Sequence, residues 1–107
     1  MPAKEVTAAL IAENTFTAWI IPKTANHISD AHTHFLNVSI AGTWVGTITL
    51  QRRFGSNDSE SSRDITGGSW TENAEEELYD HEEGVEYRIG FKTSDYTSGT
   101  SNVRLGA

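Results

Sequence analysis

His32 and His34, which are separated by one residue, form the pattern in the sequence that most resembles a metal-binding site. On a strand both imidazoles would point to the same side, and His27 or Asp30 could add a third ligand. Zinc needs three or four converging ligands, however, and the sequence defines the spacing of only two. We therefore expect exposed loop histidines with no bound metal, and we predict no cofactor.

Carboxylates are the next candidates for chemistry. Residues 57–60 (NDSE) offer oxygen ligands but lack the glycine and glutamate positions of an EF-hand calcium loop. Residues 75–77 and 82–83 could furnish a general acid–base pair, yet neighbouring residues of a strand point to opposite faces. No glycine-rich phosphate loop and no Ser/His/Asp signature occurs in the sequence. We therefore predict that the protein is not an enzyme.

Three tryptophans, Trp19, Trp44 and Trp70, could form a platform that stacks on sugar rings. Tryptophan in a small domain more often fills the core or an interface. Trp44 lies in phase with Ile48 and Leu50 along an extended chain, which favours a core position for it. A carbohydrate-binding β-sandwich module is kept as an alternative function.

Composition limits the partners. The chain has 107 residues, a net charge of −7, 36% hydrophobic residues and no cysteine. We expect a single domain over residues 1–107 without disulfides. Such a small domain should depend on a partner or on homo-oligomerisation for part of its stability. Eight of the fifteen acidic residues fall within residues 72–86. This acidic run should be a solvated surface that repels phosphate backbones, which disfavours nucleic acid as a partner.

Membrane association and secretion are also disfavoured by the sequence. Its apolar runs are only a few residues long, so we expect no membrane span. Residues 1–4 (MPAK) are not followed by the apolar segment of a signal peptide, which favours synthesis in the cytoplasm.

The C-terminal quarter carries the clearest strand pattern. Within residues 85–91, apolar side chains alternate with Glu86 and Arg88, and the alternation resumes over residues 101–105. A polar connection over residues 93–100 separates the two stretches. Side chains alternate along a strand with a period of two, so this pattern predicts an antiparallel hairpin with one dry face. We expect its dry face to belong to the core, with these members: Tyr87, Ile89, Phe91, Val103 and Leu105.

The middle of the chain predicts a second hairpin, with strands over residues 36–41 and 44–51 and a turn at Gly42-Thr43. Residues 55–63 then read as a polar, exposed tip. Short strands are expected at residues 64–66 and 78–79, with a turn at Gly67-Gly68 between them. Part of residues 72–79 could instead form a helical turn, because alanine and glutamate favour helices.

The N-terminal third predicts a further hairpin. Residues 5–12 tolerate either helix or strand, whereas residues 15–21 are rich in β-branched and aromatic side chains. Both faces of the second stretch are apolar, with Phe16, Ala18 and Ile20 on one side and Trp19 and Ile21 on the other. Such a strand needs cover on its outer side. Residues 1–34 are therefore a possible interaction arm, in which Phe16, Trp19 and Ile21 are the candidate interface. The cover could also come from residues 5–12 or 23–34 of the same subunit.

These elements together predict an all-β fold. We expect a single antiparallel β-sandwich or small jelly roll of about seven to eight short strands.

With the strands placed, the chain resembles small virion-associated proteins of tailed bacteriophages. The likeness is carried by residues 35–52 (FLNVSIAGTWVGTITLQR) and 87–105 (YRIGFKTSDYTSGTSNVRL), and it covers roughly residues 35–106. In that family a short Ser-Phe-Asp-Gly-Gly-type turn and a tryptophan follow the Gln-Arg stretch. Here residues 54–58 (FGSND) and a serine-rich tip take that place.

The resemblance implies a virion protein with a structural role. We expect a capsid decoration (cement) protein that stabilises the phage head, bound to the major capsid protein or other virion proteins as a homo-oligomer. A neck or tail attachment protein is the alternative within this class.

Overall fold

The computed structural model describes residues 5–21, 34–54, 62–80 and 85–106, and within these ranges the chain forms strands and no helix. Accordingly, no helix in this part of the chain could cross a membrane. All strands belong to one antiparallel hydrogen-bonded sheet. They are β1 (Glu5–Leu10), β2 (Thr15–Phe16), β3 (His34–Arg53), β4 (Arg63–Trp70), β5 (Ala74–Asp80) and β6 (Glu86–Gly106).

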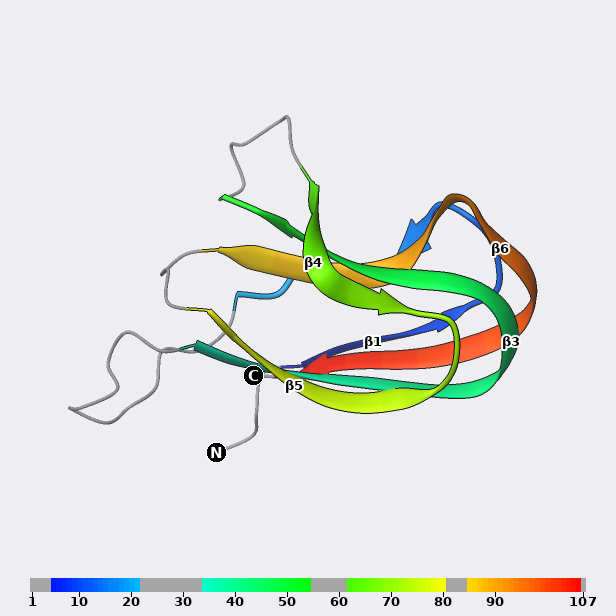
Figure 1. Ribbon diagram of the computed structural model, residues 1–107, viewed down its shortest axis with the longest axis horizontal. Helices are drawn as coiled ribbons and strands as arrows, with labels where there is room; N and C mark the ends of the chain where they lie inside the picture. Colours follow the sequence, from blue (N-terminus) through cyan, green and yellow to red (C-terminus); the bar gives the residue numbers. More distant parts are fainter. Residues whose placement is uncertain (1–4, 22–33, 55–61, 81–84, 107) are drawn as a thin grey trace.

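Two long strands form the frame of the molecule. β3 has 20 residues and β6 has 21, and they pair from Asn37 opposite Gly106 to Arg53 opposite Glu86. The register shifts around Gly46, where both strands curve back sharply (Figure 1). Each long strand therefore contributes one half to each of two stacked layers.

The first layer contains β1, the C-terminal half of β6, the N-terminal half of β3 and β5, in that order. The second layer contains β2, the N-terminal half of β6, the C-terminal half of β3 and β4. If the two halves of β3 and the two halves of β6 are counted as separate segments, the chain has eight segments in these ranges. Numbered along the chain, they lie in the order 1-8-3-6 in the first layer and 2-7-4-5 in the second. This is the two-sheet arrangement of an eight-stranded jelly roll, so the predicted all-β antiparallel sandwich is confirmed.

The two hairpins predicted in the middle and at the C-terminus were wrong, because the turn residues bend long strands instead of ending them. Gly42-Thr43 lies inside β3, and residues 93–100 lie inside β6. Gly46, with a φ of 150°, shows why the bend needs glycine: a Cβ there would lie 2.3 Å from the carbonyl oxygen of Asp95. The partner strand is too close at this point to admit any side chain.

The N-terminal hairpin prediction was also wrong. β1 and β2 each pair with a different half of β6, so residues 11–14 carry the chain from the first layer to the second. Asn14, in a left-handed conformation with a φ of 54°, lies in this crossing. The helical alternatives for residues 5–12 and 72–79 are overturned by strands β1 and β5.

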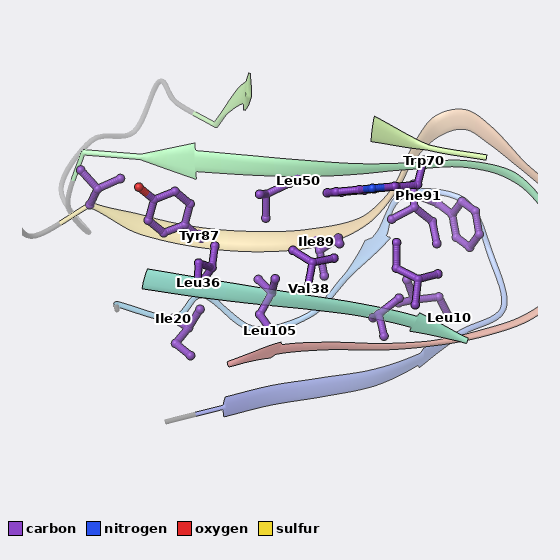
Figure 2. Packing of buried hydrophobic residues seen from close by; sticks show 14 residues of the cluster. Leu10, Ile20, Leu36, Val38, Leu50, Trp70, Tyr87, Ile89, Phe91 and Leu105 are labelled. Atoms are coloured by element: carbon purple, nitrogen blue, oxygen red, sulfur yellow. The ribbon is translucent and has the colours of Figure 1, made fainter. Parts of the chain in front are cut away.

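The core lies between the two layers. In Figure 2 the labelled side chains of both layers point into this space, including Leu10 and Ile20 from the N-terminal third. The predicted dry face is confirmed, since all five of its members are buried: Tyr87, Ile89, Phe91, Val103 and Leu105. One core therefore joins the N-terminal strands to the long strand pair.

Truncation of Ile89 to alanine should severely destabilise the protein. The side chain is fully buried, and removing such a side chain costs about 2–5 kcal/mol through lost burial and the cavity left behind. Asn102→Ala, on the exposed face of the same strand, should change the free energy of unfolding by less than about 0.5 kcal/mol. Urea unfolding of both variants measures the difference, and equal losses would contradict the register described here.

Candidate functional site

The candidate metal and calcium ligands fall mostly outside the described residues. His27, Asp30, His32 and residues 57–60 and 82–83 all lie there. His34 begins β3, with its backbone in register with Asp80 of β5. Within the described ranges, no three His, Asp or Glu side chains are grouped so that they could hold a metal ion.

The three tryptophans do not form a common platform. Trp70 is only 8% exposed and belongs to the core. Trp44 packs edge-on against Phe91, with ring centroids 5.7 Å apart, and its indole N–H donates to Asn73 Oδ1 at 2.7 Å. Trp19 lies elsewhere, on the outer face of the second layer. A sugar platform built from all three rings is therefore ruled out.

The segment after β2 changes its facing because it contains one extra residue. Phe16 pairs with Gly90, the Thr17 N–H donates to the Ile89 carbonyl at 2.9 Å, and Ile20 pairs with Tyr87. From Thr17 to Ile20 the N-terminal segment advances by three residues, whereas β6 advances by only two, from Ile89 to Tyr87. The extra residue makes this a β-bulge. A one-residue shift exchanges the two faces of a strand, so Thr17 and Ile20 are both buried.

The predicted facing of this segment was therefore wrong. Alternation places Phe16 with Ile20 and opposite Trp19, whereas Ile20 is buried in the core and Phe16 and Trp19 both lie against arginines. Ile21, the third candidate interface residue, is 41% exposed.

Phe16, Trp19, Arg53 and Arg88 form an aromatic–guanidinium cluster on the outer face of the second layer. The Arg88 Cζ lies 3.9 Å from the ring centroid of Phe16 and 4.7 Å from that of Trp19. The Arg53 Cζ lies 4.3 Å from the Trp19 ring. Cation–π contacts of this kind contribute about 0.5–2 kcal/mol each. The same subunit therefore supplies part of the cover that the apolar N-terminal segment requires.

Cross-strand pairing fixes the positions of the two arginines. Arg53 of β3 is opposite Glu86 of β6, and the two side chains form an ion pair. Gln51 is opposite Arg88, whose Nε–H donates to Gln51 Oε1 at 3.0 Å. The guanidiniums are thus held by the register of the two longest strands rather than by a loop.

The hydrogen-bonded chain continues into β4. The Gln51 Nε2 donates to Asp64 Oδ1 at 3.0 Å, and the Lys92 ammonium donates to Asp64 Oδ2 at 2.6 Å. The hydrogen bond from Lys92, supported by that from Gln51, lowers the pKa of the Asp64 carboxyl, and the same bond raises the pKa of Lys92. Burial, and then the positive charge of Arg53, lower the pKa of Arg88.

A surface groove lies beside this chain of polar groups, and we call it the Arg88 groove. Its lining consists of side chains from the N-terminal crossing and from both long strands: Asn14, Phe16, Gln51, Arg88, Lys92 and Thr93. Near the groove in sequence, the Ser94 N–H donates to Glu13 Oε1 at 2.6 Å, which ties the N-terminal crossing to β6. The groove therefore combines cationic, amide and aromatic groups on a hydrogen-bonded frame.

Where the structure describes it, the acidic run over residues 72–86 is largely exposed, unlike the partly buried aromatic–guanidinium cluster. Residues 75–77 on β5 are exposed, with Glu75 accepting a hydrogen bond from Ser39 Oγ at 2.6 Å. Glu86 is the exception, since it is almost fully buried against Arg53. The two outer faces of the sandwich thus differ in charge, acidic along β5 and partly cationic along the N-terminal half of β6.

Sequence reasoning identified Phe16 and Trp19 but missed their arginine partners. Alternation placed Glu86, Arg88 and Lys92 on the wet side of a strand, which was the available signal. Their partners Gln51 and Arg53 follow only from the register between β3 and β6.

Gly90→Ala should detach β2 from the sheet. A Cβ at Gly90 would lie 2.1 Å from the Thr15 carbonyl oxygen and 2.6 Å from the Phe16 Cα, so the backbone must move. We expect a loss of about 1–3 kcal/mol and faster amide hydrogen exchange in residues 15–20. Gly106→Ala is the control, because the three atoms nearest to its Cβ would all belong to the end of the flexible Arg104 side chain. Unchanged exchange in Gly90→Ala would contradict the close pairing of β2.

Asp64→Asn should destabilise the protein only above acidic pH. The folded-state pKa of Asp64 lies below the ordinary 3.8, so its contribution is present above about pH 4 and is lost as the pH falls through the lowered pKa. Both partners are substantially exposed, and such pairs contribute only about 0.2–1 kcal/mol. Urea midpoints at pH 7 and about pH 2 should show a deficit at the higher pH alone. A deficit of equal size at both pH values would contradict this assignment.

Comparison with known proteins adds no family assignment. No family model matches the chain, and no curated protein matches it. The resemblance noted in the sequence, the fold and the site are therefore the basis of the function proposed below.

Proposed function

We propose that the chain is a non-enzymatic structural protein of a tailed-phage particle, a decoration protein bound to the outside of the capsid. The resemblance of residues 35–52 and 87–105 to small virion-associated proteins supports the phage particle as its location. Jelly rolls occur in viral capsid proteins and also in lectins, so the architecture agrees with this role without deciding it.

The aromatic–guanidinium cluster is the observation that carries the docking role. Tryptophan and arginine are the residue types that contribute most to binding at protein interfaces. Here Trp19 is half-buried between Arg53 and Arg88, on a sheet face fixed by cross-strand pairing. A rigid surface loses little conformational entropy when it binds. We therefore propose that this face, with the neighbouring Ile21, contacts the major capsid protein or another virion protein.

Sheet edges offer a second means of attachment. Within the described residues, β1, β2, β4 and β5 each pair with only one strand, so each has one unpaired side. A neighbouring chain can satisfy such an edge with backbone hydrogen bonds. Many weakly bound copies acting together would then stabilise the shell through avidity.

Trp19→Ser should weaken particle binding without unfolding the protein. The ring lies outside the core cluster, and a hot-spot residue contributes more than about 1.4 kcal/mol, so we expect at least about tenfold weaker binding. Co-sedimentation with particles that lack the protein measures binding, and light scattering measures the oligomeric state. Ile11→Ser is the matched control, because Ile11 is an exposed apolar residue in the crossing between layers.

Three outcomes would overturn parts of this proposal. If the folded Trp19→Ser variant binds like the wild type, the docking surface lies elsewhere. If cryo-electron microscopy finds the protein on particles in about a dozen copies rather than hundreds, the neck or tail alternative replaces decoration. Absence from virions, together with glycan binding that Trp19→Ala abolishes, would favour the carbohydrate-binding alternative.

A further inference from the structure

We propose that the Arg88 groove binds a carboxylate group, supplied by an acidic side chain of the docking partner. The groove and its donors are features of this chain, whereas the source of the carboxylate rests on the proposed function.

Among the described residues, no hydrogen bond involves the terminal nitrogens of Arg88. Its Nε–H is used by Gln51, and the rings of Phe16 and Trp19 lie close to its Cζ. Within the described part of the chain, no carboxylate forms an ion pair with Arg88. The terminal nitrogens of a guanidinium present parallel donors that match the two oxygens of a carboxylate.

Local charge pairing favours a single negative charge on the ligand. Of the two cations that line the groove, Lys92 is already bound to Asp64, and neighbouring Arg53 is bound to Glu86. Arg88 therefore contributes the unbalanced charge. A carboxylate supplies one negative charge, whereas a phosphate near neutral pH supplies between one and two. Asp64 and Glu86 would also repel the additional charge of a phosphate.

The surroundings of Arg88 would gain from such a ligand. Burial and the charge of Arg53 both disfavour the charged guanidinium, as the lowered pKa of Arg88 shows. An incoming carboxylate would compensate for both effects. Phe16 forms an apolar wall of the groove and lies directly beside the guanidinium. Asn14 and Thr93 add further polar groups to the lining.

A pair of short peptides tests the proposal on the isolated protein. The probes are acetyl-Gly-Glu-Gly-amide and the matched acetyl-Gly-Gln-Gly-amide, added at equal ionic strength to isotope-labelled protein and followed by NMR. We expect saturable shifts of the Arg88 Nε–H and Trp19 indole signals with the glutamate peptide. The glutamine peptide should bind at least tenfold more weakly, because it lacks the charge.

Two Arg88 variants and one control variant make the test specific. Arg88→Gln removes the charge and should weaken binding of the glutamate peptide at least tenfold. Arg88→Lys keeps the charge but loses the fork of donors, so it should bind with intermediate affinity. Arg104→Gln is the matched control on the first layer, where the Arg104 Nε–H donates to Glu5, and it should bind like the wild type. The NMR spectrum of each variant reports whether the fold is retained.

Several results would overturn the carboxylate assignment. They are equal shifts with both peptides, no saturable shift at tens of millimolar peptide, wild-type binding by Arg88→Gln, or tighter binding of inorganic phosphate than of the glutamate peptide. None of these results would overturn the docking proposal, which is tested separately by co-sedimentation of the Trp19→Ser variant with particles. Conversely, a protein that binds the glutamate peptide but is absent from virions would retain the site and lose the proposed phage role.

Discussion

The antiparallel pairing of β3 with β6 supports the rest of the structure, because each of the remaining described strands pairs with one of these two. β1 and β2 extend the sheet from β6, and β4 and β5 extend it from β3. The bend near Gly46 then brings the two halves of the pair face to face. Both layers, the core between them and the jelly-roll order therefore follow from one long ladder folded on itself.

The same ladder positions the candidate site. Gln51 opposite Arg88 and Arg53 opposite Glu86 are consecutive outward-facing pairs of that ladder. The bulge after Phe16 then turns Trp19 toward the arginines and Ile20 into the core. The site thus combines a rigid part, set by the central strands, with a part contributed by the N-terminal segment.

Sequence alternation predicted the fold class and the dry faces. Side chains alternate between the two faces of a strand with a period of two, whichever strand it pairs with. Alternation failed at Gly42 and over residues 93–100, where polar and glycine-rich stretches resemble turns but are bends in paired strands. It also failed at Trp19, because a bulge is a property of the pairing with Tyr87 and not of the local sequence. The arginine partners were missed for the same reason: they depend on a register between residues far apart in the chain.

The position of β6 after all the other described strands has a consequence for synthesis on the ribosome. β6 is central in both layers, and its last residues pair with β1 and β3 together, as in Gly106 with Glu5 and Asn37. A protein whose N-terminal part folds first can bury apolar surface while translation continues. Here neither layer is complete at its centre until β6 has emerged, because β6 pairs on both of its sides in each layer. Until β6 has been made, the edge of β3 that pairs with it therefore stays unpaired and open to chaperones or to aggregation.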